Sequence, residues 1–356
     1  MIRLGDFKAT ERQKKIVNEI LDSGNLTEGK YVDLLEREME KYLGVKHAIL
    51  VSSGTTGLQL ISHYLGVNQL ICVPSLTFPA TINAFALTGT RFAFCDVGDD
   101  LQINIDTLTD EEKRKITVMV PVHLMGYPAN MDKIMEEAKK YNWVVIEDAC
   151  EAFGGEYKGK KVGTIGDFGV YSFYMSHNLS TGELGLVVTN NSDTAEILRS
   201  LKNHGRVGDP MKFNHRYVGS NYKTTEFMAG ICYDNMSHVT SILKTRFDNA
   251  KYLFDNITNS NLKPFPCPEG FSPLGYPIRA ISEEYRNKMC QALNAADIET
   301  RYIFPCLSNQ KAYWFVKTEY PVANELEKTC FYIGVHHFLK KTDLKKMVGV
   351  LNNVDI

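Results

Sequence analysis

The sequence predicts an α/β protein, with a mainly parallel seven-stranded sheet in a large domain and a smaller α+β domain after it. Short apolar runs alternate with helical patterns over the first two-thirds of the chain, which is typical of a sheet covered by helices on both faces. From Ala48 to Thr90 there is no Asp, Glu, Lys or Arg, as expected at the centre of such a fold. The pattern changes near residue 235, so we expect domains at 1–235 and 236–356.

The first elements carry clear boundary signals. Thr10 and Gln13 form the two ends of a capping box, which predicts a helix running to about residue 21. An amphipathic pattern over 31–42, stopped by Gly44, predicts a second helix. Strands are expected over 47–51, 70–73, 91–95, 116–121, 143–147, 170–174 and 186–189, with helices over 56–64, 80–87, 131–141 and 194–203.

The C-terminal part reads differently. One long helix is expected over about 225–254, followed by the closely spaced Pro264, Pro266 and Pro268. Short strands over 274–278 and 299–303 then mix with helices over 282–295 and 342–352. This mixture predicts the smaller α+β domain.

Composition excludes several classes of function. The 356 residues carry 40 Lys and Arg against 42 Asp and Glu, whereas a protein that grips nucleic acid through phosphates is far more basic. Pro74 and Pro79 interrupt the uncharged stretch, so no membrane span of about 18 apolar residues survives. The eight cysteines are scattered without a CxxC pair and no apolar signal core opens the chain, so we expect reduced thiols and a cytoplasmic location.

Ligands of open α/β sheets collect at the carboxyl ends of the strands, and two such ends carry suggestive residues. After the strand at 47–51 come Ser52-Ser53-Gly54-Thr55-Thr56-Gly57 and then a helix. Small residues there expose backbone N–H groups to an anion such as phosphate, although an ordinary strand–helix turn has the same composition. Phe78 follows the next strand. Its ring either stacks on a planar ligand or packs in the hydrophobic core.

Two further strand ends carry titratable residues. Glu147 and Asp148 alternate in direction, so only one of them points towards a given site. A carboxylate there either holds a ring nitrogen protonated or caps the next turn. His177 lies in a hydroxyl-rich run from Ser172 to Gly185, where a lone histidine is either catalytic or structural.

Together, these features resemble the sugar aminotransferase family of fold type I pyridoxal phosphate (PLP) enzymes, over nearly the whole chain. Further ordered matches are Gly29-Lys30-Tyr31-Val32, Pro121-Val122-His123-Leu124-Met125-Gly126, Glu147-Asp148-Ala149-Cys150-Glu151, Gly166-Asp167-Phe168, Asn203-His204-Gly205 and Asn221-Tyr222-Lys223 with Glu226. The resemblance implies the fold type I architecture for the predicted sheet and small domain.

The resemblance also supplies roles for the cofactor site. It implies that Gly54, Thr55 and Ser172 hold the cofactor phosphate and that Phe78 stacks on the pyridine ring. Asp148 then pairs with the ring nitrogen, which keeps the ring an electron sink, and Glu151 lies near the ring hydroxyl. In such enzymes the residue at Asn221 reaches the phosphate of the neighbouring subunit, so a homodimer is expected.

One departure decides the expected function. Aminotransferases of this family carry, at the position of His177, the lysine that binds the cofactor covalently. No lysine lies between Lys161 and Lys202. Imidazole forms no stable Schiff base but moves protons near neutral pH. We therefore expect a non-covalently held cofactor, as pyridoxamine phosphate (PMP), with His177 as the catalytic residue.

With histidine at this position, the sequence resembles a smaller group, the nucleotide-sugar 3-dehydratases, which includes the GDP-4-keto-6-deoxy-D-mannose 3-dehydratase of colitose synthesis. The resemblance implies loss of the C3 hydroxyl from a nucleotide-linked 4-keto-6-deoxyhexose, with glutamate restoring PMP. Cys232 and Cys290 lack a clustered third partner, so no iron–sulfur cluster and no metal is expected. Lys223 stands where the family has arginine. The alternatives are an atypical sugar aminotransferase and an inactive relative that binds cofactor or sugar.

Overall fold

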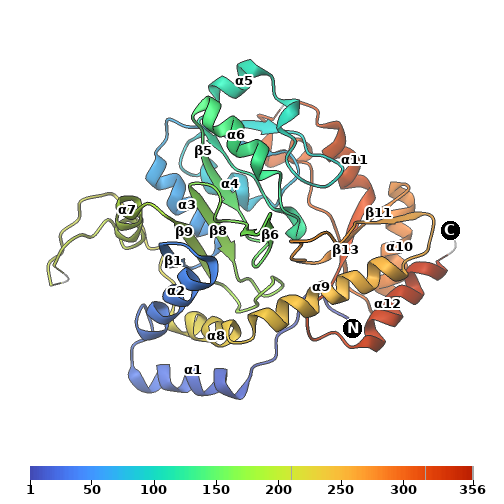
Figure 1. Cartoon of the computed structure of the whole chain (residues 1–356), viewed down its shortest axis with the longest axis horizontal. Helices are drawn as coiled ribbons and strands as arrows, with labels where there is room; N and C mark the ends of the chain where they lie inside the picture. Colours follow the sequence, from blue (N-terminus) through green and yellow to red (C-terminus); the bar gives the residue numbers. More distant parts are fainter. Residues whose placement is uncertain (210, 317, 355–356) are drawn as a thin grey trace.

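The computed structural model describes residues 1–209, 211–316 and 318–354 and is built around a sheet of seven strands (Figure 1). The strands lie in the order β1-β9-β8-β5-β4-β2-β3. Their bounds are β1 His47–Val51, β2 Leu70–Pro74, β3 Arg91–Cys95, β4 Val118–Met119, β5 Val144–Asp148, β8 Phe168–Ser172 and β9 Gly185–Thr189. The predicted α/β class with a mainly parallel seven-stranded sheet is confirmed.

The sheet is parallel from β8 through β5, β4 and β2 to β3, while β9 runs antiparallel to both β8 and β1. The β4 strand is shorter than the predicted 116–121. The residues that follow it still bond to neighbouring strands, since the Val120 N–H donates to the Cys72 carbonyl and the Pro121 carbonyl accepts the Asp148 N–H, both at 2.9 Å.

Alternate residues of the strands pack on opposite helical layers, as the two-residue period of a strand requires. Ile49 and Val51 join a cluster that includes residues of α3, whereas Ala48 and Leu50 join a cluster with residues of α2 and α8. The helices around this sheet are α2 Lys30–Leu43, α3 Gly54–Leu65, α4 Ala80–Ala86, α6 Met131–Tyr141, α7 Ser192–Lys202 and α8 Glu226–Met236. The carboxyl ends of the parallel strands are left for loops, which is where the candidate site lies.

A second sheet has the order β10-β11-β13-β12, with antiparallel neighbours throughout. Its strands are β10 Leu262–Pro264, β11 Tyr276–Ala280, β12 Thr300–Tyr302 and β13 Cys330–Ile333. The helices of this part are α9 Val239–Asn256, α10 Glu283–Ala295, α11 Pro321–Thr329 and α12 Lys341–Asn353. This is the expected α+β character, while the boundary at residue 235 stays a prediction.

The single helix predicted over 225–254 is wrong. It divides into α8 and α9 at Ser237 and His238, and His238 leaves the helical region with φ −119° and ψ 6°. The break lets the two halves bury different faces. Cys232 packs with the N-terminal helices, whereas Leu253 packs in the cluster that includes the second sheet.

The remaining elements are short, apart from the first helix. They are α1 Glu11–Ser23, which has the predicted capping box, α5 Asp110–Lys115, β6 Glu156–Tyr157, β7 Lys160–Lys161 and the short 3₁₀ turns η1 Ile105–Thr107, η2 Leu124–Gly126, η3 Leu307–Asn309 and η4 Lys311–Tyr313. Ile2 pairs with Ile298, so the first residues lie on the C-terminal part. Among the described residues, no helix has the length and apolar character needed to cross a membrane.

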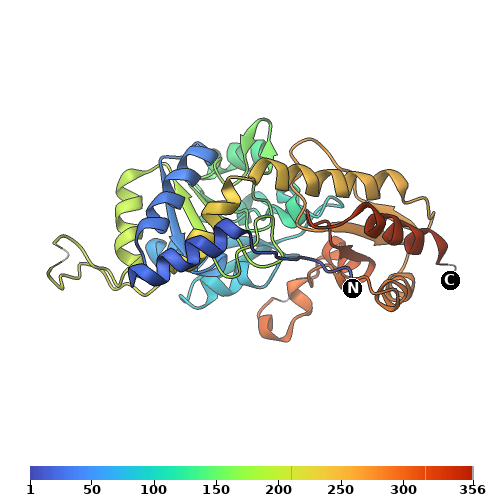
Figure 2. The ribbon, with the colours of Figure 1, turned by 90° about the horizontal axis from the view of Figure 1, so that it is seen from below.

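One segment stands away from the body. The chain after α7 projects as an arm in two perpendicular views (Figures 1 and 2). Three apolar side chains on this arm, Met211, Phe213 and Val218, are 85–88% exposed. An apolar surface of this kind on a projecting segment is typical of an interface.

Candidate active site

The turn between β1 and α3 forms an anion cradle. The Ser53 hydroxyl accepts the Thr56 N–H at 3.2 Å, and the Ser53 carbonyl accepts the Gly57 N–H at 3.0 Å. Among the described residues, the N–H groups of Gly54 and Thr55 have no partner. Two free N–H groups at the start of a twelve-residue helix favour a bound phosphate.

Gly54 is required here for space. A Cβ on Gly54 would lie 2.5 Å from the Cys150 Sγ and 3.0 Å from the Ser172 Cβ. Gly54, Cys150 and Ser172 are therefore in close contact, although they come from three different strand ends. The structure thus brings together Gly54, Thr55 and Ser172, the three residues predicted to hold a phosphate.

Asp148 ends β5 and is buried. Its Oδ2 accepts the Thr81 hydroxyl at 2.8 Å, and its Oδ1 accepts the Cys150 N–H at 3.2 Å. Thr81 is itself 3.0 Å from the hydroxyl of Thr77. These bonds fix the carboxylate in one orientation, as a partner for a protonated ring nitrogen requires.

Glu147 has a different role from its neighbour. It is fully buried and accepts bonds from the N–H groups of Gly163, Ile165 and Gly166 and from the His123 ring, at 2.6–2.9 Å. The predicted alternation of the two acids therefore places Asp148 at the site, while Glu147 anchors the 163–166 loop.

Phe78 is 53% exposed although it follows a buried strand. Its ring meets Phe304 edge to face at a centroid distance of 5.6 Å. The Phe78 carbonyl accepts the Thr81 N–H at 3.1 Å, and Thr81 holds Asp148. An aromatic ring linked in this way to the carboxylate suits stacking on a planar ligand.

Glu151 is a buried acid whose Oε2 accepts the Met125 N–H at 2.7 Å. Burial raises its pKa to about 8, and the negative charge of Asp148 acts in the same direction, against the bond from Met125. Glu151 is therefore mainly protonated at neutral pH and can donate a hydrogen bond to a ring oxygen.

His177 lies beside the end of β8, with its Nδ1 3.3 Å from the Ser172 carbonyl. Because a carbonyl only accepts, this contact assigns the proton to Nδ1 and leaves the lone pair on Nε2. Burial, together with the positive charge of Arg246, lowers the His177 pKa to about 4, while hydrogen bonds with the backbone of Ser172 and Cys150 act in the opposite direction. The imidazole is therefore a neutral base at pH 7.

Two further residues, Asn178 and Arg246, support the site and were not among the residues predicted from the sequence. Asn178 donates to the Ser272 and Pro273 carbonyls at 3.1 and 3.3 Å, which anchors the loop of His177. Arg246 on α9 donates to Pro273 as well, at 3.0 Å. The sequence pattern indicates that Arg246 is buried, because Arg246 lies four residues after Ile242 and seven before Leu253, on the apolar face of the helix.

Asn221 lies apart from the other predicted residues. Its side chain is exposed and accepts the Lys223 N–H at 3.3 Å. The next residue, Tyr222, accepts the Ser52 N–H at 3.0 Å, so Asn221 sits at the root of the arm beside the anion cradle. In the ranges that the structure describes, no three His, Cys, Asp or Glu gather in a metal-binding arrangement.

Comparison with known proteins now places the chain. A model of the DegT/DnrJ/EryC1/StrS aminotransferase family matches residues 8–352. The chain belongs to this family. The predicted resemblance to the PLP-dependent sugar aminotransferases is confirmed at this level.

One curated relative and two solved structures illustrate what this chain is similar to. A GDP-perosamine synthase of Escherichia coli O157:H7 is 31% identical over 327 residues, which cover 89% of this chain and 88% of the relative. A solved GDP-4-keto-6-deoxy-D-mannose 3-dehydratase of E. coli, with bound hydrated PLP, is 24% identical, with a TM-score of 0.90 and 99% of each chain covered. The PMP form of a putative sugar aminotransferase, Spr1654 from Streptococcus pneumoniae, is 22% identical, with a TM-score of 0.92 and coverage of 99% and 98%.

These two solved structures show that the fold is shared, and the family's cofactor can be tested against the residues present. A PLP or PMP phosphate fits the free N–H groups of Gly54 and Thr55. A protonated ring nitrogen fits the fixed carboxylate of Asp148, and the open face of Phe78 fits the ring plane. The side chains at this site therefore suit the cofactor of the family.

Proposed function

We propose that this family member removes the C3 hydroxyl of a nucleotide-linked 4-keto-6-deoxyhexose and releases a 3-deoxy-4-keto sugar. Glutamate is the proposed amino donor that regenerates PMP. The observation that carries the proposal is His177, which stands where the family's aminotransferases have lysine and whose Nδ1 lies 3.3 Å from the carbonyl of Ser172, a residue proposed to hold the phosphate. The sugar-nucleotide enzymes among its relatives support the substrate class.

The chain's own residues account for the proton movements. When bound, the cofactor supplies an amine and an electron-accepting ring. His177 is neutral at pH 7 and accepts a proton at Nε2, since Nδ1 faces the Ser172 carbonyl. The protonated imidazole can then return this proton to the departing C3 oxygen. The same residue thus serves as base and acid.

The surrounding side chains orient and isolate these groups. Asp148, held by Thr81, keeps the ring nitrogen protonated. Glu151 holds a proton near the ring oxygen, because its pKa lies at about 8. Asn178 fixes the loop of His177, so the base keeps one position during the reaction.

A second candidate is sugar amination. It is favoured by the aminotransferase names of the relatives, such as the GDP-perosamine synthase of E. coli. Under this alternative, His177 would move protons between the amino donor and the sugar. The two candidates give different products from the same substrate.

The deciding experiment is mass spectrometry after incubating the protein with PLP, glutamate and GDP-, CDP- or dTDP-4-keto-6-deoxyhexose. A product that lacks one oxygen atom and keeps its ketone is expected. A product with an amine in place of the ketone would reject dehydration. Absence of both product and bound cofactor would favour an inactive relative.

A matched variant tests the role of His177 directly. His177→Lys is expected to lose most dehydration and to gain a covalent link to the cofactor that borohydride reduces and fixes. If this variant forms no such link while still binding PLP, the side chain at 177 does not face the reactive carbon. His177→Asn, which neither links nor titrates, serves as the control.

We also propose a homodimer in which Asn221 contacts the cofactor phosphate of the partner subunit. The projecting arm and its exposed Met211, Phe213 and Val218 support this arrangement. Mixing inactive Asn221→Ala with inactive His177→Asn tests it. If subunits exchange at random, about a quarter of the sites become intact and activity returns. No recovery, despite exchange shown by tagged subunits, would place Asn221 in its own subunit's site.

A further inference from the structure

The loop that carries Phe78 is bonded to the C-terminal part of the chain. Ser75 begins this loop directly after β2 and is fully buried. Its carbonyl accepts the Leu307 N–H at 2.7 Å, and the next residue, Leu76, pairs with Cys306 in an antiparallel bridge. The backbone that leads to Phe78 is therefore fixed against the segment that follows β12.

This segment, residues 303–316, also contacts side chains on either side of that backbone. The Phe304 ring meets the Phe78 ring edge to face, with centroids 5.6 Å apart. Further along the segment, the Tyr313 hydroxyl donates to the Asn83 Oδ1 on α4 at 2.8 Å. A shift of the 303–316 segment would therefore reach the Phe78 ring directly.

The start of α11, the helix that comes after this segment, is held from a distant part of the chain. Within residues 318–354, which the structure describes, the N-cap residue Tyr320 makes no side-chain bond to the helix, and Pro321 has no N–H. The N–H groups of Val322 and Ala323 donate instead to the Asp96 Oδ2 and Oδ1, at 3.1 and 3.0 Å. A helix N-terminus carries partial positive charge, so this carboxylate stabilises the start of α11.

Asp96 joins three parts of the fold. It directly follows β3 and is 5% exposed. Besides the two bonds from α11, its Oδ1 accepts the Val97 N–H at 2.8 Å and the Ser75 hydroxyl at 3.4 Å. One buried carboxylate therefore contacts the start of the Phe78 loop, the turn after β3 and the start of α11.

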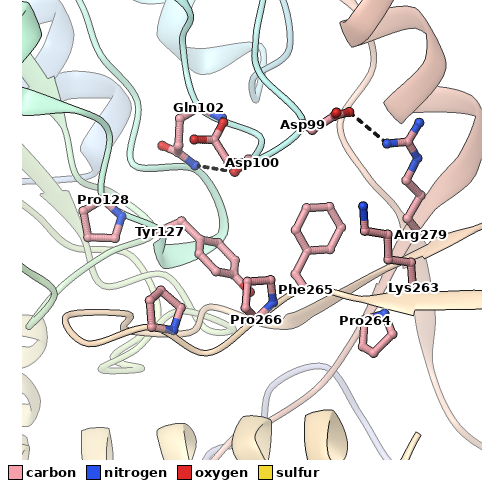
Figure 3. Close-up of a pocket in the computed structure, with 11 residues that line it drawn as sticks. Asp99, Asp100, Gln102, Tyr127, Pro128, Lys263, Pro264, Phe265, Pro266 and Arg279 are labelled. Atoms are coloured by element: carbon pink, nitrogen blue, oxygen red, sulfur yellow. Dashed lines mark hydrogen bonds and ion pairs between the residues drawn. The ribbon is translucent and has the colours of Figure 1, made fainter. Parts of the chain in front are cut away.

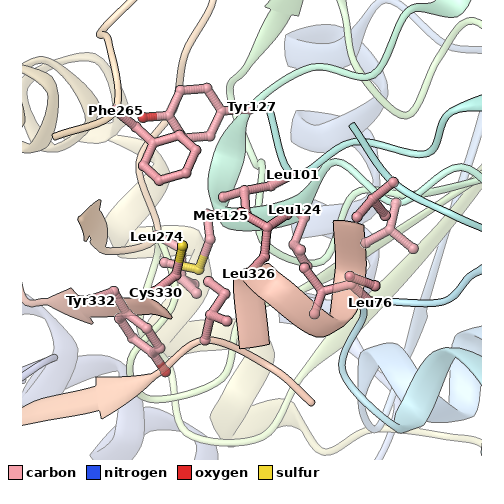
Figure 4. Packing of buried hydrophobic residues seen from close by; sticks show 14 of the residues in the cluster. Leu76, Leu101, Leu124, Met125, Tyr127, Phe265, Leu274, Leu326, Cys330 and Tyr332 are labelled. Atoms are coloured by element: carbon pink, nitrogen blue, oxygen red, sulfur yellow. The ribbon is translucent and has the colours of Figure 1, made fainter. Parts of the chain in front are cut away.

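A second set of contacts holds α11 in the same place. Arg279 on β11 pairs with Asp99, in the turn after β3, at 2.9 Å (Figure 3). Arg279 also pairs with Glu325 on α11. Leu326 of α11 and Leu76 of the Phe78 loop belong to the same buried cluster (Figure 4). The helix is thus attached to the turn after β3 and packed with the loop before Phe78.

We propose that Asp96 is a positioning residue for the cofactor ring. It fixes the Ser75 end of the Phe78 loop and the start of α11, and these two elements hold Phe78 and Phe304 in one arrangement. Cofactor binding and the ordered start of α11 are then coupled, so each stabilises the other. The inference rests on the proposed place of the ring at Phe78, and it is independent of whether dehydration or amination follows.

Hydrogen exchange of the wild-type protein, with and without saturating PLP, tests this coupling. PLP should slow exchange of the Val322 and Ala323 N–H groups by roughly threefold or more. The internal reference is the Gln13 N–H at the start of α1, which donates to the Thr10 hydroxyl at 3.0 Å and should be unchanged. Equal slowing at both helix starts, or no slowing at α11, would overturn the proposal.

Two variants test the carboxylate itself. Asp96→Asn removes the charge and one acceptor at nearly constant size. It should weaken PLP roughly three- to tenfold in an absorbance titration. It should also change the circular dichroism of PLP at saturation, because the ring then takes another orientation. Ser75→Ala keeps both bonds to α11 and tests the link to the loop even if Asp96→Asn folds poorly. It should change the same two signals in the same direction, with PLP weakened about twofold.

Asp234→Asn is the matched control. Asp234 is another buried aspartate that accepts a hydroxyl from a distant segment, that of Thr10 at 2.7 Å. This control should leave the dichroism of bound PLP unchanged. If it changes the dichroism as much as Asp96→Asn does, general loosening of the fold explains the effect and the proposal is wrong.

Phe78→Ala separates this inference from the proposed site. It should weaken PLP and change the dichroism, because it removes the ring on which the cofactor stacks. If the dichroism is unchanged, the cofactor does not lie at Phe78, and the proposed site fails together with this inference. If Phe78→Ala changes the dichroism while neither Asp96→Asn nor Ser75→Ala does, the proposed site stands and the role of Asp96 is structural.

Discussion

Replacing Gly54 by alanine tests the geometry of the anion cradle. The added methyl group would lie 2.5 Å from the Cys150 Sγ and 3.0 Å from the Ser172 Cβ. Ordinary van der Waals contact begins at 3.4 Å, so the thiol would have to move by about 0.9 Å. The start of α3 carries the free N–H groups, so any shift of this backbone reaches the phosphate site directly.

The size of the effect follows from this overlap. Inserting a methyl group into a packed site costs about 1–3 kcal/mol, and the higher helix propensity of alanine offsets at most about 1 kcal/mol. We therefore expect Gly54→Ala to lower the free energy of unfolding by about 1–2 kcal/mol. Cofactor affinity should fall by at least tenfold, because the N–H groups of Gly54 and Thr55 must move together with the backbone.

Cys150→Ala supplies the matched control. It removes the atom that makes the closest contact, while the Ser172 Cβ remains 3.0 Å away. In the double variant the penalty of Gly54→Ala should shrink, giving a favourable coupling of roughly 1 kcal/mol between neighbouring sites. Urea unfolding measures the stability of all four proteins, and absorbance titration with PLP measures cofactor affinity.

Two results would refute the reasoning. If Gly54→Ala binds PLP as tightly as the wild type, the start of α3 does not hold the phosphate. If the effects of the two substitutions simply add, the contact between Gly54 and Cys150 is not the cause of the loss.

Three further predictions concern buried polar groups. Burial, aided by the charge of Arg246, lowers the His336 pKa from 6.5 to about 4. The unfolded chain therefore binds this proton at a higher pH than the folded protein does, so the free energy of unfolding should fall as the pH drops from about 6.5 towards 4. Urea unfolding of His336→Asn should show this slope reduced by up to ~1.4 kcal/mol per pH unit. Glu147→Gln should lower the free energy of unfolding by about 3–5 kcal/mol in the same assay, since an amide cannot accept all four bonds that Glu147 receives. A decrease below about 1 kcal/mol would contradict this reasoning. Thr81→Val should weaken PLP about fivefold by absorbance titration and lower the free energy of unfolding by about 1–3 kcal/mol, because it removes the hydroxyl that bonds to the buried Asp148; unchanged affinity would show that Asp148 needs no such support.

Much of the fold was predictable because local signals and burial agree. The α6 helix falls at the predicted 131–141, and β1 at the predicted 47–51. The wrong prediction was the continuous helix over 225–254. No Pro or Gly marks its break at Ser237 and His238, which results from two halves that pack on different neighbours.

The candidate site was predictable only at the strand ends. Asp148 ends β5 and His177 lies five residues after the end of β8, so their position near the carboxyl ends of the strands could be read from the sequence. The partners that orient them come from distant segments. Thr81 reaches Asp148 across 67 positions and Asn178 reaches Ser272 across 94, and such pairings depend on tertiary packing rather than on local pattern.

The place of β1 at the sheet edge has a consequence for synthesis on the ribosome. Within the described part of the chain, β9 is its one strand neighbour, and β9 ends 138 residues after β1, at Thr189 against Val51. At an elongation rate of about 5–20 residues per second this interval lasts roughly 7–28 s. Throughout that time β1, at the start of the uncharged stretch, lacks the strand with which it pairs, whereas β2 in the same stretch can already pair with β3 and β4. Nascent chains that stop before residue 189 should therefore be the ones that aggregate or recruit chaperones.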